Sequence, residues 1–234
     1  MDEKEVVGSS ATVAEGGTKP KVNYSYELKS STYNKEAQLL QFTDEFTMDF
    51  GELEQRILEN GRTDLINSIS SKILPNIQAA ATGYTTATEF KGGEVVSNPH
   101  DFDVIAAMAA QVDSATFGGA STNVALMDTF KKYRMGISKD NENSYVNSPD
   151  VLNGVSFVGN PDVTVGDLIV GDFKQYNILL RGGIIVKVGY NGTDFAENKF
   201  SVVLEQFYFD YISSIRSKAL VSDTFSNVKS LISA

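Results

Sequence analysis

The sequence predicts an α+β fold, with helices in the middle of the chain and antiparallel strands toward its end. A stripe of apolar residues at spacings of three and four, within residues 50–73, is the main evidence for helix. Patterns typical of strands dominate from Val151 onward, and residues 20–46 also mix β-branched and aromatic residues with turn formers. Helices and strands that occur in separate groups are typical of α+β proteins.

The first 46 residues predict a flexible terminus followed by a hairpin. Residues 1–17 are polar and rich in glycine, which is typical of a mobile chain end. In residues 18–46, apolar side chains alternate with polar ones over 22–28, and a second apolar group follows at 39–42. We therefore expect two antiparallel strands joined by a long loop.

Residues 47–78 contain the strongest helical pattern in the chain. Asp49, followed three residues later by Glu52, resembles a capping box, and Pro75 is expected to end the helix. At ~1.5 Å per residue such a helix would be nearly 40 Å long, and Gly61 could mark a bend in it. The apolar stripe consists of Phe50, Leu53, Ile57, Gly61, Leu65, Ile69 and Ile73.

Residues 79–190 predict shorter helices, strands and loops. Asn98 is expected to cap a second helix, in which Pro99 occupies the first turn. A short strand at 124–127 is followed by Asp128 as the cap of a third helix. Further strands are predicted at 153–158, 163–170, 176–180, 183–190 and 199–213.

Composition excludes several classes of protein. The net charge is −10, from 20 basic and 30 acidic residues, so we expect no specific nucleic-acid site. No apolar run approaches the roughly 20 residues that cross a bilayer, and the acidic start has no apolar signal segment. The chain has no Cys, which removes disulfides and thiolate chemistry.

The motifs of common enzymes are also missing from the sequence. His100 is the only histidine, and its position at the start of a helix fits an exposed residue better than a catalytic triad. Four glycine pairs are better explained by turns than by phosphate loops. The aromatic residues at 207–211 could stack bases or sugars, but a strand that contacts a neighbouring subunit explains them better. We expect no enzyme activity, cofactor or metal.

In their order and spacing, these pieces resemble a tailed-phage major capsid protein of the Hong Kong 97 type, with its N-terminal part missing or reduced. Residues 13–20 resemble the segment that enters this family's E-loop, a long hairpin laid over an adjacent subunit. The helix at 49–74 is similar to the family's spine helix, and the passage from Gly154 to Phe173 resembles the return toward the peripheral domain. The resemblance covers nearly all of residues 13–225, and no single motif carries it.

The resemblance implies a structural protein that forms an icosahedral phage or prophage shell from pentamers and hexamers. Contacts between subunits would then involve Lys19, Pro20, Tyr24, Tyr26 and Tyr33. Scaffold and portal proteins are possible partners, and the protein would occur in the virion and, during assembly, in the host cytoplasm. The implied domains are a flexible N-terminus (1–17), an E-loop-like hairpin (18–46), a spine helix (47–78), a mainly axial domain (79–190), and a peripheral-domain strand with the C-terminus (191–234).

Some members of this family join neighbouring subunits by an isopeptide bond. Matched motif by motif, Lys19 falls at the position of the attacking lysine, Asn198 at the asparagine, and Glu205 at the glutamate that acts as base. A buried glutamate with a raised pKa could accept the lysine proton. The same three residues could instead form a turn, a strand cap and an ion pair.

Two other functions stay open. An encapsulin-like compartment would share the fold but hold cargo enzymes rather than DNA. A stand-alone ligand-binding β module would use the aromatic residues at 207–211.

Overall fold

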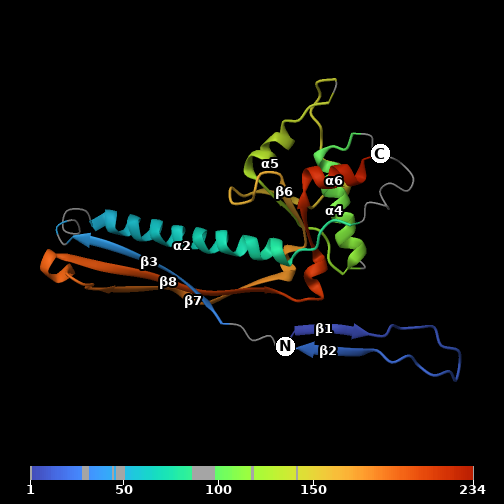
Figure 1. Ribbon diagram of the computed structural model, residues 1–234, viewed down its shortest axis with the longest axis horizontal. Coiled ribbons are helices and arrows are strands. Elements are labelled where there is room, and N and C mark those ends of the chain that lie inside the picture. The colour runs from blue at the N-terminus through green and yellow to red at the C-terminus, as the bar shows by residue number, and fades with distance from the viewer. Residues whose placement is uncertain are drawn as a thin grey trace. The chain divides into compact units, whose positions relative to one another are not determined.

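The computed structural model describes residues 2–27, 32–43, 45, 51–85, 98–116, 119–140 and 142–233. Figure 1 shows mixed helices and strands, which confirms the predicted α+β class. The chain divides into two compact units: unit 1 comprises Met1–Lys29, Ile77–Tyr176 and Ile212–Ala234, and unit 2 comprises Ser30–Asn76 and Asn177–Tyr211.

The order of elements places the long helix before two groups of strands. The helices are α2 (Gly51–Ala80), α4 (Asp101–Ala115), α5 (Thr129–Gly136) and α6 (Phe225–Ile232). The strands are β1 (Asp2–Val7), β2 (Asn23–Glu27), β3 (Asn34–Thr43), β4 (Val124–Met127), β5 (Ser156–Gly159), β6 (Asp167–Gly171), β7 (Tyr176–Gly189), β8 (Lys199–Ile212) and β9 (Leu220–Thr224). The described residues also contain the short 3-10 turns η1 (Asp150–Leu152), η2 (Phe173–Gln175), η3 (Asp194–Glu197) and η4 (Arg216–Ala219).

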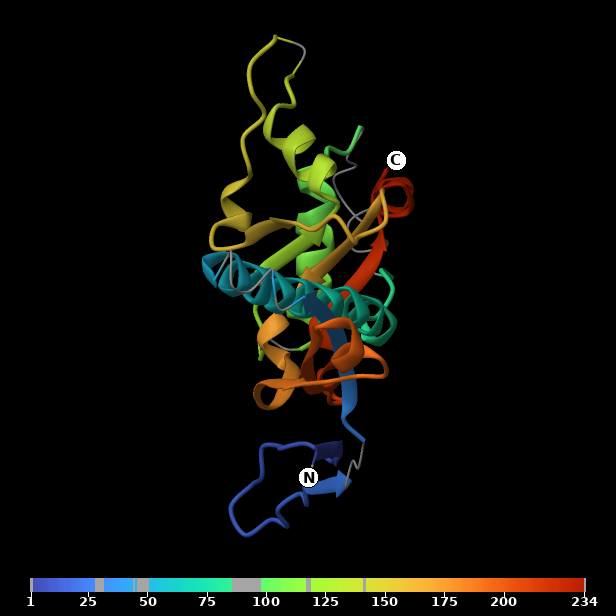
Figure 2. The same ribbon diagram turned by 90° about the vertical axis from the view of Figure 1, so that its left-hand side faces the viewer.

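Unit 2 is a three-stranded sheet, in the order β3-β8-β7, with α2 along one face (Figures 1 and 2). The antiparallel pairing of β3 with β8 runs from Asn34 opposite Tyr208 to Thr43 opposite Lys199. Leu65 of α2 is 2% exposed and packs with the sheet residues in one apolar cluster. In the described part of α2, the predicted apolar stripe therefore lies on the face that covers the sheet, with Ile57 packed beside Leu65.

Two expectations for α2 were wrong. The helix continues through Pro75 to Ala80, because Leu74 and Ile77 are buried on either side of the proline and offset the hydrogen bond that it cannot donate. Gly61 does not mark an interruption of the helix: a Cβ at this position would lie 2.8 Å from a methyl carbon of Leu204. Glycine therefore permits close packing of helix on sheet. The proposed capping box at Asp49 lies outside the described residues.

Polar side chains also hold α2 to the sheet. Glu36 of β3 accepts a hydrogen bond from Ser68 Oγ at 2.7 Å and forms an ion pair with Lys72. The bonds from Lys72 and then Ser68 lower the pKa of Glu36. Asn76 Nδ2 donates to Asp210 Oδ2 at 2.9 Å. These contacts fix the helix along its length as well as by its apolar face.

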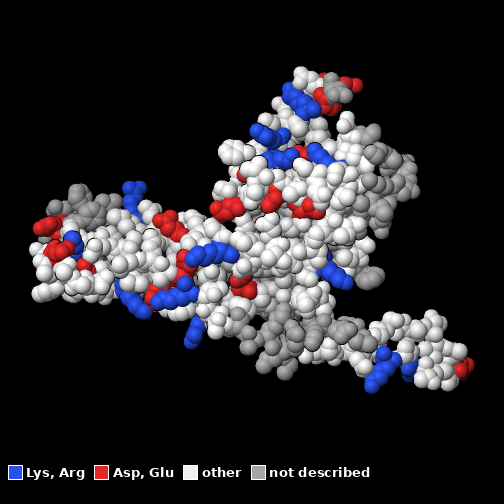
Figure 3. Space-filling model, in the orientation of Figure 1, with Lys and Arg blue, Asp and Glu red and all other residues white. Residues whose placement is uncertain are grey.

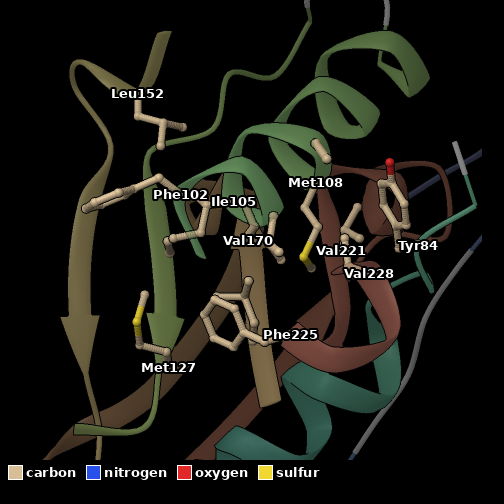
Figure 4. Packing of buried hydrophobic residues seen from close by; sticks show 14 of the residues in the cluster. Tyr84, Phe102, Ile105, Met108, Met127, Leu152, Val170, Val221, Phe225 and Val228 are labelled. Atoms are coloured by element: carbon tan, nitrogen blue, oxygen red, sulfur yellow. The ribbon is translucent and has the colours of Figure 1, made fainter. Parts of the chain in front are cut away.

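Unit 1 has a four-stranded sheet in the order β5-β4-β6-β9, in which only β4 and β5 are parallel. Helix α4 packs against β6, β9 and α6, and α5 packs against β5. Figure 4 shows Phe102, Ile105 and Met108 of α4 pointing toward side chains of the sheet. Ile105 and Met108 are both fully buried, so this is the core of unit 1.

One carboxylate of unit 1 joins helices α4, α5 and α6. Asp101, the first residue of α4, forms ion pairs of 2.7 Å with Lys131 of α5 and Lys229 of α6. Burial raises the pKa of Asp101, but the two lysines outweigh it, and the net shift is downward. Because the carboxylate is held by partners from two other helices, this ion-pair network fixes their positions relative to α4.

The cap of α4 differs from the prediction. The helix begins at Asp101 and its cap is His100, whereas Asn98 adopts a left-handed conformation with φ of 84°. His100 Nδ1 accepts from the Phe102 N–H, and its Nε2 lies 3.1 Å from Ser138 Oγ. The only histidine therefore has a structural role. Asp128 caps α5 as predicted, by accepting from the Lys131 N–H.

The N-terminal strands pair differently from the prediction. Residues 2–7 form β1, which pairs with β2, so the expectation that 1–17 is a flexible N-terminus was wrong for this segment. β3 pairs with β8 instead of β2, so the two strands within 18–46 do not form a hairpin with each other. Alternation predicts which side chains share a face of a strand, but it does not identify the partner strand.

The C-terminal segment also has a different partner. β9 pairs with β6 in unit 1, whereas residues 191–234 were expected to complete the domain of the long strand. β7 lies in unit 2 beside β8, although residues 79–190 were expected to be mainly axial. Helix α6 was not predicted, although the Thr224 cap and buried Phe225, Val228 and Ile232 gave a usable signal.

The motif Gly171-Asp172-Phe173 forms a corner between β6 and β7. Asp172 Oδ1 accepts from Asn123 Nδ2 at 2.8 Å, and the Phe173 N–H donates to Asn123 Oδ1 at 3.1 Å. A Cβ on Gly171 would clash with the backbone oxygen of Ala219 and lie 2.9 Å from Leu220 Cα. The close approach of two backbones therefore requires glycine at position 171.

Replacing this glycine should destabilise the protein. We expect Gly171→Ala to lower the free energy of unfolding by about 1–3 kcal/mol or more. The reason is that backbone atoms cannot move aside as a flexible side chain can. Gly183→Ala is the matched control, since a Cβ there meets no atom within 4 Å. Urea denaturation of both variants measures the difference, and equal stabilities would contradict the close approach.

Candidate subunit interface

The β1–β2 hairpin presents four of the five predicted contact residues. Lys19 and Pro20 are exposed in the connection between the two strands. Tyr24 and Tyr26 lie two residues apart on β2, and their side chains are 59% and 58% exposed. Residues two apart on a strand point to the same side. The hairpin thus carries two large aromatic side chains on one open face.

Tyr33 lies apart from this hairpin in the chain, just before β3 in unit 2. Its ring packs edge-on against Phe209, with centroids 6.3 Å apart, and the Arg181 guanidinium lies over the Tyr33 ring, 5.9 Å from its centroid. Tyr33 is 41% exposed. It is therefore partly engaged within its own unit.

A row of aromatic rings continues from Tyr33 along β8. Phe209 and Tyr211 stack at 5.5 Å, and Lys35 lies over the ring of Phe207 at 5.9 Å. Tyr208, between them, points to the opposite face and is 4% exposed. The aromatic run is thus buried on one side of the strand and partly exposed on the other.

Asn198 lies just before β8, whereas Glu205 lies in the middle of the strand. Asn198 is exposed and precedes the strand in a left-handed conformation, with φ of 52°. Glu205 lies seven residues further along, about 23 Å away at roughly 3.3 Å per residue. The structure therefore does not bring these two side chains together within one chain.

Glu205 lies between two lysines from the neighbouring strands. Lys187 of β7 forms an ion pair with Glu205 Oε2 at 2.8 Å, and Lys35 of β3 forms one with Oε1. Glu205 itself is only 6% exposed. The hydrogen bonds from Lys187 and Lys35 outweigh the effect of burial and lower the pKa of Glu205. The expectation of a base with a raised pKa was therefore wrong for the single chain.

A second carboxylate orders the turn between β7 and β8. Asp194 is 2% exposed and accepts from Ser201 Oγ at 2.5 Å and from the Asn191 N–H at 2.8 Å. Gln41 of β3 also donates to it. The bond from Ser201 is the main cause of the lowered pKa of Asp194. Asn198, four residues later, is thus held at the end of a rigid turn.

Among the described residues, no group of three or more His, Asp or Glu side chains is arranged to hold a metal ion. No helix in the described part of the chain is both long enough and apolar enough to span a membrane.

Comparison with known proteins gives structural matches without sequence matches. No family model and no curated protein matches the chain. A structure from Microbacterium phage Oxtober96 is 15% identical with a TM-score of 0.63, over 95% of this chain and 84% of that one. One from Mycobacterium phage Bobi is 14% identical with a TM-score of 0.62, over 96% and 85%. The chain has the Hong Kong 97-type capsid fold.

The same fold occurs beyond phages. A virus-like particle from Pyrococcus furiosus matches with a TM-score of 0.55 at 8% identity, over 95% of this chain and 86% of that one. Identities this low leave the Hong Kong 97-type fold as the shared property. The residues of the candidate interface are therefore argued from their own exposure and chemistry.

The two ion pairs of Glu205 should make stability depend on pH. Because its pKa in the fold lies below the ordinary value of 4.5, the ionised carboxylate stabilises the fold above that pH, and this is lost as pH falls through the lowered pKa. We expect Glu205→Gln to lower the urea midpoint at pH 7. The difference in midpoint between the unmodified protein and the variant should be smaller at about pH 3. Glu59→Gln, an exposed change on α2, is the control. A difference in midpoint that is the same at both pH values would contradict the stabilising role of the ionised Glu205.

Proposed function

We propose that this protein forms the icosahedral shell of a phage or prophage head, by assembling into pentamers and hexamers around the genome. The observation that carries the proposal is the exposure of the β1–β2 hairpin. Residues 8–26 are all exposed except Val22, which is half-buried. A two-stranded hairpin is marginally stable by itself in water. We infer that a second copy of the chain covers it.

The fold supports this proposal, because it spans nearly the whole chain and is shared with structures from several phages. In this proposal the β1–β2 hairpin is the E-loop, α2 is the spine helix, and unit 2 is the peripheral domain. The sheet of β4, β5, β6 and β9, with its helices, is the axial domain. The role is structural and needs no cofactor.

The acidic composition fits a wall that encloses DNA without binding it tightly. A net charge of −10 disfavours strong contacts with phosphates. Scaffold and portal proteins are the expected partners during assembly. The proposed location is the virion, and the host cytoplasm before the virion is complete.

An encapsulin-like compartment is the second candidate, favoured by the match to the virus-like particle from Pyrococcus furiosus. The contents of purified particles separate the two functions. DNA protected from nuclease supports a phage head, whereas a co-purifying enzyme supports a compartment.

The proposed function predicts assembly that depends on the β1–β2 hairpin. The full chain should form rings or shells visible by negative-stain electron microscopy, and the double change Tyr24→Ser, Tyr26→Ser should reduce the yield at least about tenfold by removing two aromatic anchors. Tyr190→Ser, which alters an equally exposed tyrosine elsewhere, should assemble normally. A protein that stays strictly monomeric at high concentration would contradict the proposed function.

The proposal extends to an isopeptide bond between Lys19 of one copy and Asn198 of another. Both residues are exposed, so a neighbouring copy can reach them. The neutral Lys19 amine would attack the side-chain carbonyl of Asn198, forming a C–N bond and releasing ammonia. Glu205 of an adjacent subunit is the candidate base, and it would have to exchange Lys35 or Lys187 for the attacking lysine.

Denaturing gel electrophoresis of mature particles tests the bond. We expect a ladder of covalent oligomers that is absent before assembly and abolished by Lys19→Ala. Lys21→Ala, in the same connection between β1 and β2, is the control and should leave the ladder intact. Monomer bands alone from intact particles would rule the bond out.

A further inference from the structure

Helix α5 carries an apolar stripe on its solvent side. Phe130 and Tyr133 of α5 and Ile137, the residue that follows its last turn, are 76%, 67% and 67% exposed. At 3.6 residues per turn these positions, with exposed Arg134, fall within an arc of about 100°. Large apolar side chains that are exposed next to one another in this way are typical of a contact surface.

The opposite side of the same helix borders a cavity of about 330 Å³. Lys132, Met135 and Gly136 of α5 line it on one side, roughly 180° around the helix from the stripe. Its other walls are mainly apolar, from Phe102, Met127, Val146 and Phe157. Unit 1 therefore has a protruding aromatic stripe and an apolar cavity on opposite sides of one helix.

Charge differs between helix α5 and the segment that follows it. Residues 129–139 contain four of the chain's 20 basic residues and none of its 30 acidic ones. Residues 140–150, which continue into the cavity wall at 146–148, contain three acidic residues and no basic one. Figure 3 shows Lys and Arg side chains gathered around α5. Of these basic residues only Arg134 lies on the stripe, because Lys132 lines the cavity, Lys131 is paired with Asp101 and Lys139 lies over the Tyr145 ring. Arg134 is thus the stripe residue whose charge is complementary to the acidic segment that leads to the cavity wall.

We propose that the α5 stripe of one copy inserts into the α5 cavity of the next, with Phe130 and Tyr133 as the anchors. Because donor and acceptor surfaces lie on opposite sides of the helix, the contact is head-to-tail rather than that of a symmetric dimer. A head-to-tail contact is the kind from which a closed ring of five or six copies is built. Arg134 of one copy then faces the acidic segment 140–150 of its neighbour. This inference rests on the proposed function, to which it adds the surface that builds each pentamer or hexamer.

Two variants of the full chain test the two surfaces separately. Phe130→Asp removes the stripe anchor, and Gly136→Leu blocks the cavity at a position where a Cβ meets no atom within 4 Å. Each variant alone should associate at least roughly 30-fold more weakly than the unmodified protein in analytical ultracentrifugation. Mixed in equal amounts, they should form heterodimers and nothing larger, since one intact stripe and one intact cavity remain. Phe130→Leu and Phe195→Asp should form rings normally.

Each outcome separates this inference from the proposed function. If the unmodified protein and both variants all form shells, the α5 contact is wrong and the shell function stands. Rings that never close into shells would support the contact and contradict the function, and a strictly monomeric unmodified protein would overturn both. Symmetric dimers of Gly136→Leu alone would refute the head-to-tail contact. If Phe130→Asp abolishes DNA retention and leaves assembly unchanged, the occupant is nucleic acid and the proposal is wrong.

Discussion

The register of β8 between β3 and β7 is the constraint on which unit 2 depends. Leu204 points toward α2 and packs against Gly61, while Glu205, the next residue, lies on the other face between Lys35 and Lys187. A slip of one residue would exchange these environments, placing a carboxylate against the helix and a leucine between two ammonium groups. Apolar burial and ion pairing therefore specify the same register from opposite faces of the sheet.

Periodicity in the sequence was enough to predict the elements and their buried faces, but it did not identify their partners. The spacing of Leu65 and Ile69 correctly identified the face of α2, because a helix stripe is local information. The pairing of β3 with β8 joins residues more than 150 positions apart, and no local pattern encodes that choice. The Hong Kong 97-type resemblance supplied the fold class, whereas the pairing of β1 with β2 became visible only in the structure.

The candidate interface shows the same limit in chemical terms. Exposure of Tyr24 and Tyr26 agrees with their predicted role as contact residues, because nothing in their own strand covers them. The environment of Glu205 could not be predicted, since its two lysines come from strands that are adjacent only in the folded sheet. Likewise the apolar residues of α5 gave no signal as a surface stripe until the helix and its buried side were located.

The Asp101 ion pairs have a mechanical consequence. α5 is only eight residues long, and a helix of this length is not stable by its own hydrogen bonds alone. Through Lys131 it is connected to the first turn of α4, and through the same carboxylate to Lys229 on α6. A force that pulls on α5 would therefore be shared by α4, α5 and α6 and by the core beneath them. The short helix can then transmit force to the rest of unit 1 without separating from the sheet.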